Sequence, residues 1–308
     1  MVAYPKISIV TINLNQVQFI EDTIQSVLHQ GYPNLEYIIV DGASNDGSQE
    51  IIQKYEDRIT YWISEPDEGH YDGLRKGLEH ATGDIMGWLN SDDLYHHNAL
   101  FTVAEIFGEF PDVKWLTGYP TWYSEDGKPL VEMPLNNTIS KTGMNNPFFY
   151  TKWARWSKYR YYNDDYLAIQ QESTFWRREL WDRAGGYLDT NYKYAFDMEL
   201  WSRFFRYDQL YTTYALLGGF RVRTDNQKSL DNQSAYQEEC KRILVQELDS
   251  MPLSVYFVIR LRYFLSLILK PFYYFDIPFA RYLYCRLMGL PKLIRYNYGK
   301  RKFEKSWF

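Results

Sequence analysis

The sequence predicts an α/β fold in which helices flank a mostly parallel sheet. Short β-rich runs alternate with stretches of helical periodicity from the start to about residue 120, which is the pattern of strand–helix–strand units. The apolar run 87–89 ends abruptly in polar and acidic residues, as expected of a buried strand that delivers acids to one edge of a sheet. With 308 residues, 45% of them hydrophobic, the chain can bury a large core.

The strands and helices of the first half can be assigned in order. We expect strands over residues 7–12, 37–40, 60–63, 85–89 and 114–117. A helix follows the first strand, because a set of apolar residues recurs there at helical spacing: Val17, Ile20, Ile24, Val27 and Leu28. Further helices are expected around residues 51–55 and 72–80. These elements form the first of three expected regions, residues 1–120.

The second region, residues 121–234, has a looser pattern and begins with an aromatic stretch. Its aromatic residues could stack on sugar faces or could equally serve as core and loop anchors: Trp122, Trp153, Trp156, Tyr159, Tyr161 and Tyr162. The third region, residues 235–308, is expected to be a helical, amphipathic extension. It contains a charged helix over 235–247 and an apolar helix over 253–269 that Pro271 limits.

Polar residues follow each predicted strand of the first region. Asn13 and Asn15 follow the first strand, segment 41–47 the second, segment 65–69 the third and segment 90–93 the fourth. Loops rich in Asp, Asn and Gly are ordinarily turns. In a parallel sheet, however, ligands bind beyond the carboxyl ends of the strands, and four such loops meet at one edge. The sequence therefore predicts a ligand site there.

The acids of segment 90–93 are candidate metal ligands. Asp92 and Asp93 repel one another, so their adjacency suggests a divalent cation, Mn²⁺ or Mg²⁺, held between them and a phosphate. The alternative is that one of them caps a helix that begins near Asn98. No glycine-rich dinucleotide or P-loop motif is present, which weakens an oxidoreductase or P-loop interpretation.

A combination of motifs resembles the family 2 glycosyltransferases of GT-A fold. The motifs, in the order and spacing of that family, are VTIN at 10–13, IVDGASNDG at 39–47, SEPDEGHYD at 64–72, KG at 76–77, ATGD at 81–84 and NSDD at 90–93. The resemblance covers about residues 6 to 205. It implies a Rossmann-like GT-A fold, a metal-dependent inverting transferase, and a nucleotide-diphosphate sugar donor, most commonly a UDP-sugar, held by the first half.

The resemblance also implies roles for residues of the first half. Thr11 and Asn13 would border the base, and Asp41 would contact base or ribose. Asp72 and Lys76 would line the donor pocket, with Asn90 and Ser91 beside the diphosphate. Asp92 matches the metal-binding end of the family's acidic motif, and Asp93 could assist it. The motif's first acid is Asn90 here, and no histidine follows His97, so a late histidine ligand is unavailable.

An inverting displacement needs a base to take the proton of the acceptor hydroxyl. In the resembling family a Gly-Gly-aromatic turn precedes an acidic motif whose Asp is the base, and Asp197 occupies that position after Gly185-Gly186-Tyr187. Asp197 could instead cap the helix that follows it. Glu172 is the second candidate base or an acceptor contact, Trp201 is a further acceptor contact, and Glu199 is expected to be a helix-surface acid.

The tail is basic and aromatic. Residues 251–308 contain 11 Lys and Arg and two acidic residues, although the whole chain has a net charge of −5. An interfacial helix on an anionic membrane surface explains this mixture best, ahead of packing or oligomer contacts, and no nucleic-acid partner is expected. We expect a cytoplasmic protein, peripheral at the inner face of the plasma membrane, whose two cysteines are reduced.

The predicted function is sugar transfer to a lipid-linked or polysaccharide acceptor in bacterial cell-surface glycan synthesis. Two alternatives remain open. A sugar-phosphate nucleotidyltransferase should carry a Gly-rich basic loop soon after the first strand, and residues 11–20 contain neither Gly nor Lys. A sugar-binding or scaffold homologue with a decayed metal site would explain Asn90.

Overall fold

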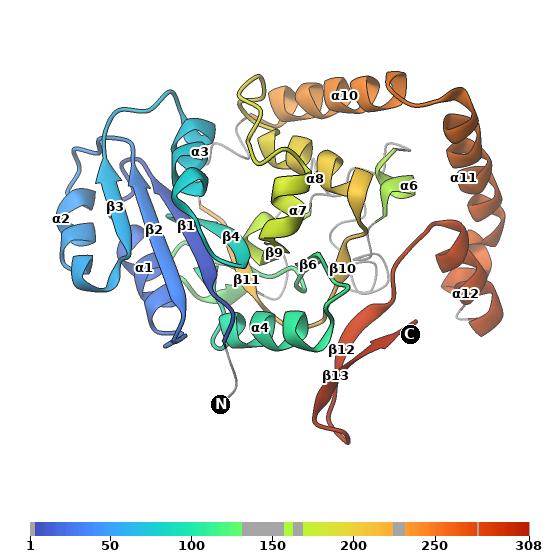
Figure 1. The fold of residues 1–308 in the computed structure, drawn as a ribbon, viewed down its shortest axis with the longest axis horizontal. Helices are drawn as coiled ribbons and strands as arrows, with labels where there is room; N and C mark the ends of the chain where they lie inside the picture. Colours follow the sequence, from blue (N-terminus) through green and yellow to red (C-terminus); the bar gives the residue numbers. More distant parts are fainter. Residues whose placement is uncertain (1–3, 131–156, 163–168, 224–231, 276, 308) are drawn as a thin grey trace.

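The structure is a computed structural model that describes residues 4–130, 157–162, 169–223, 232–275 and 277–307. Its central sheet has seven strands in the order β10-β6-β9-β4-β1-β2-β3 (Figure 1). Their bounds are β1 Ile7–Asn13, β2 Leu35–Asp41, β3 Tyr61–Ser64, β4 Ile85–Asn90, β6 Trp115–Thr117, β9 Thr174–Arg177 and β10 Tyr211–Thr212. Only β9 runs antiparallel to its neighbours, β4 and β6. The predicted mostly parallel α/β fold is confirmed.

Helices cover both faces of the sheet. Their bounds are α1 Ile20–Leu28, α2 Ser48–Gln53, α3 His70–His80, α4 Ala99–Glu109, α6 Lys158–Tyr161, α7 Arg178–Arg183, α8 Phe196–Tyr207 and α10 Gln233–Asp249, with short 3₁₀ turns η1 Glu56–Arg58 and η3 Gln171–Ser173. The helices α1, α2 and α4 share one core cluster with the sheet, and α3, α7, α8 and α10 share the other. Strand β1 alternates between them: Ile7 and Ile9 belong to the first, and Val10 and Ile12 to the second.

Helix α3 lies unusually close to the sheet, because Gly77 faces β1. A β-carbon at Gly77 would stand 2.3 Å from a methyl carbon of Val10 and 3.3 Å from one of Val40. Such a distance is far inside van der Waals contact, so no larger residue fits without moving the helix. This close approach fixes the position of α3 relative to β1 and β2.

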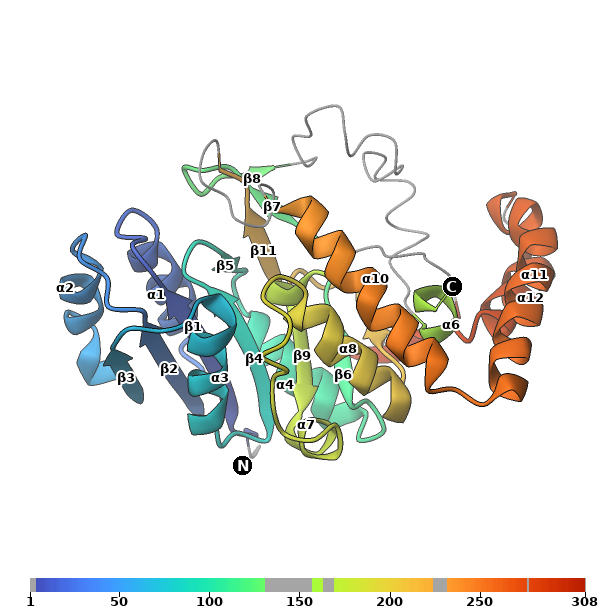
Figure 2. The ribbon, with the colours of Figure 1, turned by 90° about the horizontal axis from the view of Figure 1, so that it is seen from above.

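A second, smaller sheet stands beyond the carboxyl edge of the first. Its order is β5-β11-β7-β8, with bounds β5 Leu94–Tyr95, β7 Trp122–Tyr123, β8 Pro129–Leu130 and β11 Gly218–Arg221. Figure 2 shows β7, β8 and β11 projecting away from the central sheet. Strand β11 comes from far along the chain yet pairs with β5, which directly follows the acidic segment 90–93.

The aromatic stretch is divided between core and undescribed residues. Tyr161 and Tyr162 are buried in the cluster formed with α8 and α10, so for both the structure favours the core role over sugar stacking. Tyr159 packs beside the C-terminal helices, where its hydroxyl accepts a hydrogen bond from Arg262. Trp122 begins β7 and is partly exposed. Trp153 and Trp156 lie outside the described residues.

The C-terminal region differs from the prediction in two ways. Its elements are α11 Leu253–Tyr274, α12 Pro278–Leu287, β12 Leu293–Asn297 and β13 Lys302–Ser306. Helix α11 continues past Pro271, because a proline in the last turn removes only one backbone donor, and the carbonyl of Pro271 still accepts from Phe275. The region is also not wholly helical, since β12 and β13 form a hairpin.

The hairpin and the helices relate differently to the rest of the molecule. Ile294 and Phe303 of the hairpin are buried in the core cluster that contains α1, α2 and α4. Helices α11 and α12 pack against each other at the far side of the molecule from α2 (Figures 1 and 2). Among the described residues, we find no helix that combines the length and the apolar character needed to span a bilayer.

Candidate functional site

The carboxyl ends of β1 to β4 lie side by side, as predicted. The strand register pairs Asn13 with Asp41 and Asp41 with Ser64, and Ile12 with Asn90. The polar residues that follow four separate strands therefore share one edge of the sheet. We refer to this edge, residues 13–16, 41–47, 64–69 and 90–93, as the donor edge.

Asp41 holds three segments of the donor edge together. Its carboxylate accepts hydrogen bonds from the Asn13 side-chain amide at 2.7 Å, from the Ser64 hydroxyl at 2.6 Å and from the Ser44 backbone at 2.9 Å. Asp41 has no exposed surface, and this burial does not favour the predicted contact with base or ribose, which stays a prediction. Asn13 is better placed to offer an atom, because its buried Oδ1 has no hydrogen-bond partner among the described residues.

Thr11 does not border the donor edge. Its side chain is fully buried within β1, where its hydroxyl accepts a hydrogen bond from the Tyr37 hydroxyl at 3.1 Å. This environment does not favour the predicted contact with a base, which stays a prediction; Thr11 serves the core on the α1 side of the sheet. The residue two positions on, Asn13, is the one that reaches the edge.

Asp72 and Lys76 lie together on α3, beside the loop that follows β3. Lys76 Nζ is 2.7 Å from Glu65 and 3.4 Å from Asp72, and Arg75 binds the same Asp72 carboxylate at 2.8 Å. Burial alone would raise the pKa of Asp72, but hydrogen bonds from Arg75 and the Glu68 amide lower it below its usual value. Asp72 is thus an ionised, well-paired acid.

Asp93 is directed into the protein. It is 1% exposed, and its two oxygens accept hydrogen bonds from the Asn90 amide at 3.0 Å and the Arg221 backbone at 2.9 Å. Burial raises the pKa of Asp93 well above its usual value, and the charges of Asp92 and Glu172 add to the shift. The prediction that Asp93 assists a metal does not fit these contacts. Ser91 is buried too, and its carbonyl accepts from Thr23.

Asp92 is the acid of this pair that keeps partial exposure. Its Oδ2 lies 3.2 Å from Nε of Arg223, so the carboxylate is ion-paired. Neither acid caps α4, because the residue before that helix is Asn98 and the structure shows no side-chain cap there. In the parts of the chain that the structure describes, no three or more His, Cys, Asp or Glu side chains form a group that could hold a metal.

The donor edge therefore does not fit a divalent site built from two carboxylates. One acid is buried with both oxygens bonded, and the other already has a cationic partner. The amide of Asn90 is also engaged, since its Oδ1 lies 3.2 Å from Nε2 of His70. His70 was not predicted as a site residue; it is the first residue of α3 and follows the third polar loop.

Asp197 lies in the first turn of α8, one residue inside the helix, so it is not the predicted N-cap. Its carboxylate accepts a hydrogen bond from the Met198 backbone at 2.7 Å. Burial raises the pKa of Asp197 to about 7. The preceding residue, Phe196, makes edge contact with the His70 ring at 5.6 Å between centroids, which connects the start of α8 with the donor edge.

Glu172 and Trp201 occupy different environments from those predicted for acceptor contacts. Glu172 is 2% exposed, burial raises its pKa to about 8, and its Oε1 has no hydrogen-bond partner among the described residues. Trp201 is fully buried and stacks on Trp88, with 5.5 Å between ring centroids and 8° between planes. This environment does not favour an acceptor contact for Trp201, which stays a prediction; the indole packs between α8 and the sheet.

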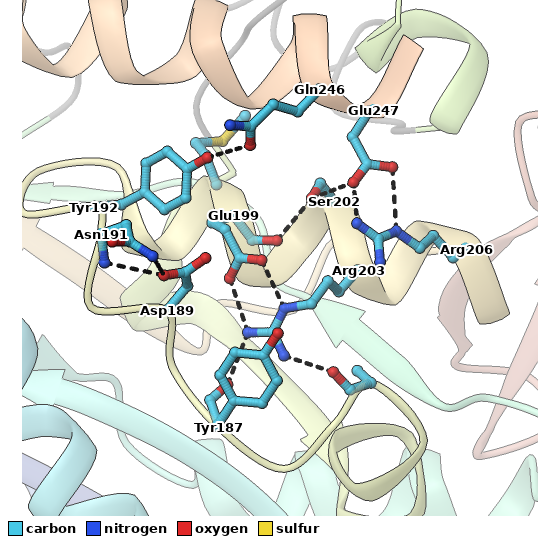
Figure 3. A network of polar contacts seen from close by, with 12 residues as sticks. Tyr187, Asp189, Asn191, Tyr192, Glu199, Ser202, Arg203, Arg206, Gln246 and Glu247 are labelled. Carbon is cyan, nitrogen blue, oxygen red and sulfur yellow. Dashed lines mark hydrogen bonds and ion pairs between the residues drawn. The ribbon is translucent and has the colours of Figure 1, made fainter. Parts of the chain in front are cut away.

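Glu199 is buried, not the surface acid predicted. It forms an ion pair with Arg203 at 2.7 Å, and the Arg203 guanidinium also donates to the carbonyls of Ala184 and Tyr187. Figure 3 shows this pair between α8 and the turn before it, with Arg206 and Glu247 linking α8 to α10. The network fixes the helix that carries Asp197.

Arg223 and Arg221 are site residues that the sequence did not reveal. No motif marks them, and they follow the acidic segment by more than a hundred residues. Both reach the donor edge because β11 pairs with β5, Gly218 opposite Tyr95. Strands of two to four residues have no periodicity of their own, so sequence alone could not place them.

Comparisons with known proteins agree with this geometry. The family model described as glycosyl transferase family 2 matches residues 8–169. A putative teichuronic acid biosynthesis glycosyltransferase of Bacillus subtilis (strain 168), TuaG, is 37% identical over 129 residues, which are 41% of this chain and 51% of that protein. The chain thus matches about half the length of this relative.

Solved structures show the same fold at low identity. The S. aureus TarS fragment 1–349 in complex with UDP-GlcNAc has a TM-score of 0.63 and 15% identity, over 92% of this chain and 80% of that one. The mannosyltransferase PcManGT of Pyrobaculum calidifontis, in complex with GDP-Man and Mn²⁺, has a TM-score of 0.52 and 15% identity, over 94% and 87%.

Proposed function

Because the chain belongs to glycosyl transferase family 2 and has the GT-A fold, we propose that it moves a sugar from a nucleoside-diphosphate sugar to a hydroxyl of a lipid-linked or polysaccharide acceptor. A UDP-sugar is the donor we favour, and the reaction inverts the anomeric centre. Support comes from a solved neighbour that holds UDP-GlcNAc and from a relative named for teichuronic acid biosynthesis. The proposal includes a place in bacterial cell-surface glycan synthesis.

The observation that carries the proposal is the position of Asp197. A carboxylate with a pKa of about 7 can take a proton near neutral pH and still be ionised in a large fraction of molecules. Phe196 packs against His70 and Trp88, so the start of α8 adjoins the end of β4. The proposed base on α8 thus adjoins the sheet edge where the donor is proposed to lie.

In the proposed reaction the acceptor oxygen attacks the anomeric carbon from the face opposite the nucleotide. The acceptor O–H bond breaks and its proton moves to Asp197, while the bond from the anomeric carbon to the β-phosphate oxygen breaks. The electron pair leaves with the nucleoside diphosphate. Asn13, Asp72 and Lys76 are proposed to hold the donor, and Glu172 remains the second candidate for the base.

A divalent ion is what GT-A enzymes commonly use to neutralise the leaving diphosphate. Asp92 is the residue of this chain that would hold one, and it would have to give up Arg223 to do so. No step proposed here depends on that ion.

The test is a transfer assay with a panel of nucleotide sugars and Asp197→Asn. We expect the variant to lose at least about 10²-fold in kcat, since general-base catalysis contributes about 10²- to 10⁴-fold, and to keep its melting temperature. Asp208→Asn is the matched control, because Asp208 ends the same helix and its pKa is also raised by burial. Full transfer activity of Asp197→Asn would show that Asp197 is not the base. Loss of activity in Glu172→Gln, with Asp197→Asn fully active, would assign the role of base to Glu172.

We further propose that the protein acts on the inner face of the plasma membrane. Helix α11 exposes apolar side chains at helical spacing along one face, Leu253, Phe257, Phe264, Ile268 and Phe272. Arg260, Arg286 and Lys292 lie on exposed positions of the same region. An apolar face bordered by cations suits an anionic bilayer surface, where rings enter the headgroup boundary and cations meet lipid phosphates.

A further inference from the structure

Arg223 places a cation at the donor edge. Its guanidinium is 7% exposed, and Nε lies 3.2 Å from Oδ2 of Asp92. One terminal nitrogen donates to the Gln16 side chain at 2.7 Å, and the guanidinium carbon stands 5.4 Å from the centre of the Phe19 ring. Gln16 and Phe19 follow β1, so Arg223 joins the loop after β1 to the end of β4.

The backbone holds Arg223 at this place. Strand β11 passes so close to η3 that a β-carbon at Gly218 would stand 2.1 Å from the carbonyl oxygen of Glu172, and one at Gly219 would stand 2.5 Å from the Tyr123 ring. The Arg221 amide then binds Asp93 at 2.9 Å. Arg223 lies two residues after Arg221, and both guanidinium groups stand over the Phe19 ring, so the two side chains share one side of the chain.

Arg221 itself is committed to structure. Its guanidinium is ion-paired with Asp22 at 3.1 Å, donates to the Glu125 carbonyl at 3.0 Å and stands 4.9 Å from the Phe19 ring centre. Arg223, in contrast, is paired with the one partly exposed acid of the segment 90–93. Arg221 thus stabilises the fold, whereas Arg223 places a positive charge at the edge where a donor diphosphate would lie.

Resting on the proposed function, we propose that Arg223 binds the β-phosphate of the nucleoside diphosphate and neutralises it as it leaves, in place of a divalent ion. Asp92 holds the guanidinium before the donor arrives. A guanidinium presents two parallel N–H groups that match phosphate oxygens and stays protonated throughout, so no proton transfer is needed.

The experiment is calorimetric titration of the whole chain with UDP, with GDP as a second probe, in EDTA and in Mn²⁺. We expect the wild type to bind the better probe in EDTA within about threefold of its affinity in Mn²⁺. Arg223→Gln should weaken binding in EDTA by about tenfold or more, the value of one charge-assisted hydrogen bond. UMP, which lacks the β-phosphate, should bind both proteins equally.

Two further variants show whether a change in binding is specific to Arg223. Arg242→Gln is the matched control, since Arg242 lies over the Tyr192 ring and beside Glu239, as Arg223 lies over Phe19 and beside Asp92, but on α10 away from the donor edge. This variant should leave binding unchanged. Asp92→Asn releases Arg223 and should retain or tighten UDP binding in EDTA. Melting temperatures of all variants exclude unfolding as the cause of a loss.

The outcomes are distinguishable. Wild-type binding that requires Mn²⁺, together with loss of binding in Asp92→Asn, would overturn the role of Arg223 and leave the proposed transferase intact. Equal weakening of UMP and UDP by Arg223→Gln would also overturn it, because the arginine would then act through the fold of the pocket. Binding of neither UDP nor GDP in either buffer would overturn the proposed donor, and the role of Arg223 with it.

Discussion

At the scale of single residues, Asp197 shows how far sequence reasoning reaches. Its position after a Gly-Gly-aromatic turn predicted a base, and the structure places it at the start of a helix beside the donor edge. The sequence could not predict the environment of the Asp197 carboxyl group. Burial raises its pKa to about 7, and the negative charge of Glu239 on α10 adds to the shift. Helix α10 lies far along the chain and has no motif in common with α8.

The raised pKa predicts the pH dependence of the reaction. The base must be ionised, so kcat/KM should fall about tenfold per pH unit below an apparent pKa of about 7. Burial raises the pKa of Tyr236 well above its usual value and that of Cys240 to about 12, so these two neighbours from α10 stay neutral across this pH range. A pH–rate profile measures this; activity that is flat between pH 5 and 8 would contradict the assignment.

At the scale of elements, the strands and helices of the first half were predictable because each buries a continuous apolar pattern. Strands β1 and β2 and helix α1 agree with the predicted segments to within three residues at each end. The smaller sheet was not predictable, because β5 and β7 have two residues each and obtain their stability from β11. Arg223 was therefore not predicted as a site residue, although its ion-pair partner Asp92 was.

Helix α8 provides a prediction at this scale. Arg203→Met should lower the free energy of unfolding by about 3–5 kcal/mol, because it leaves Glu199 buried without its partner and removes two bonds to the preceding turn. Urea denaturation measures this change in the free energy of unfolding. Lys54→Met is the control: Lys54 pairs with Glu21 at the surface, where both side chains are exposed, so its loss should cost clearly less. Equal costs would show that burial of the Glu199–Arg203 pair does not decide the stability of α8.

At the scale of the whole molecule, the C-terminal region has two parts with different partners. The hairpin β12–β13 belongs to the body, since Ile294 is fully buried and bridges to Thr213. Helices α11 and α12 expose apolar rings instead. Composition predicted the basic, aromatic character of residues 251–308 but could not separate these parts, because both contain the same residue types. Deletion of the whole region would consequently damage the core.

Substitution separates the two parts where deletion cannot. Phe257→Glu with Phe264→Glu should release the protein from vesicles of phosphatidylglycerol and phosphatidylcholine, at least about tenfold in partition, since each buried ring is worth about 1.5–3 kcal/mol. The control pair, Leu216→Glu with Val245→Glu, changes exposed apolar residues elsewhere and should stay bound. Co-sedimentation with the vesicles measures this binding. If the α11 variant stays bound to the vesicles, that face of α11 would instead be a protein contact.

The place of the β12–β13 hairpin has a consequence for synthesis. Ile294 and Phe303 complete a core whose other members lie between residues 7 and 217, so a ribosome makes α11 and α12 before that core can close. The apolar helices thus emerge while the body is still incomplete. Translation that stops before residue 294 should therefore leave the core open and yield a protein that proteases remove.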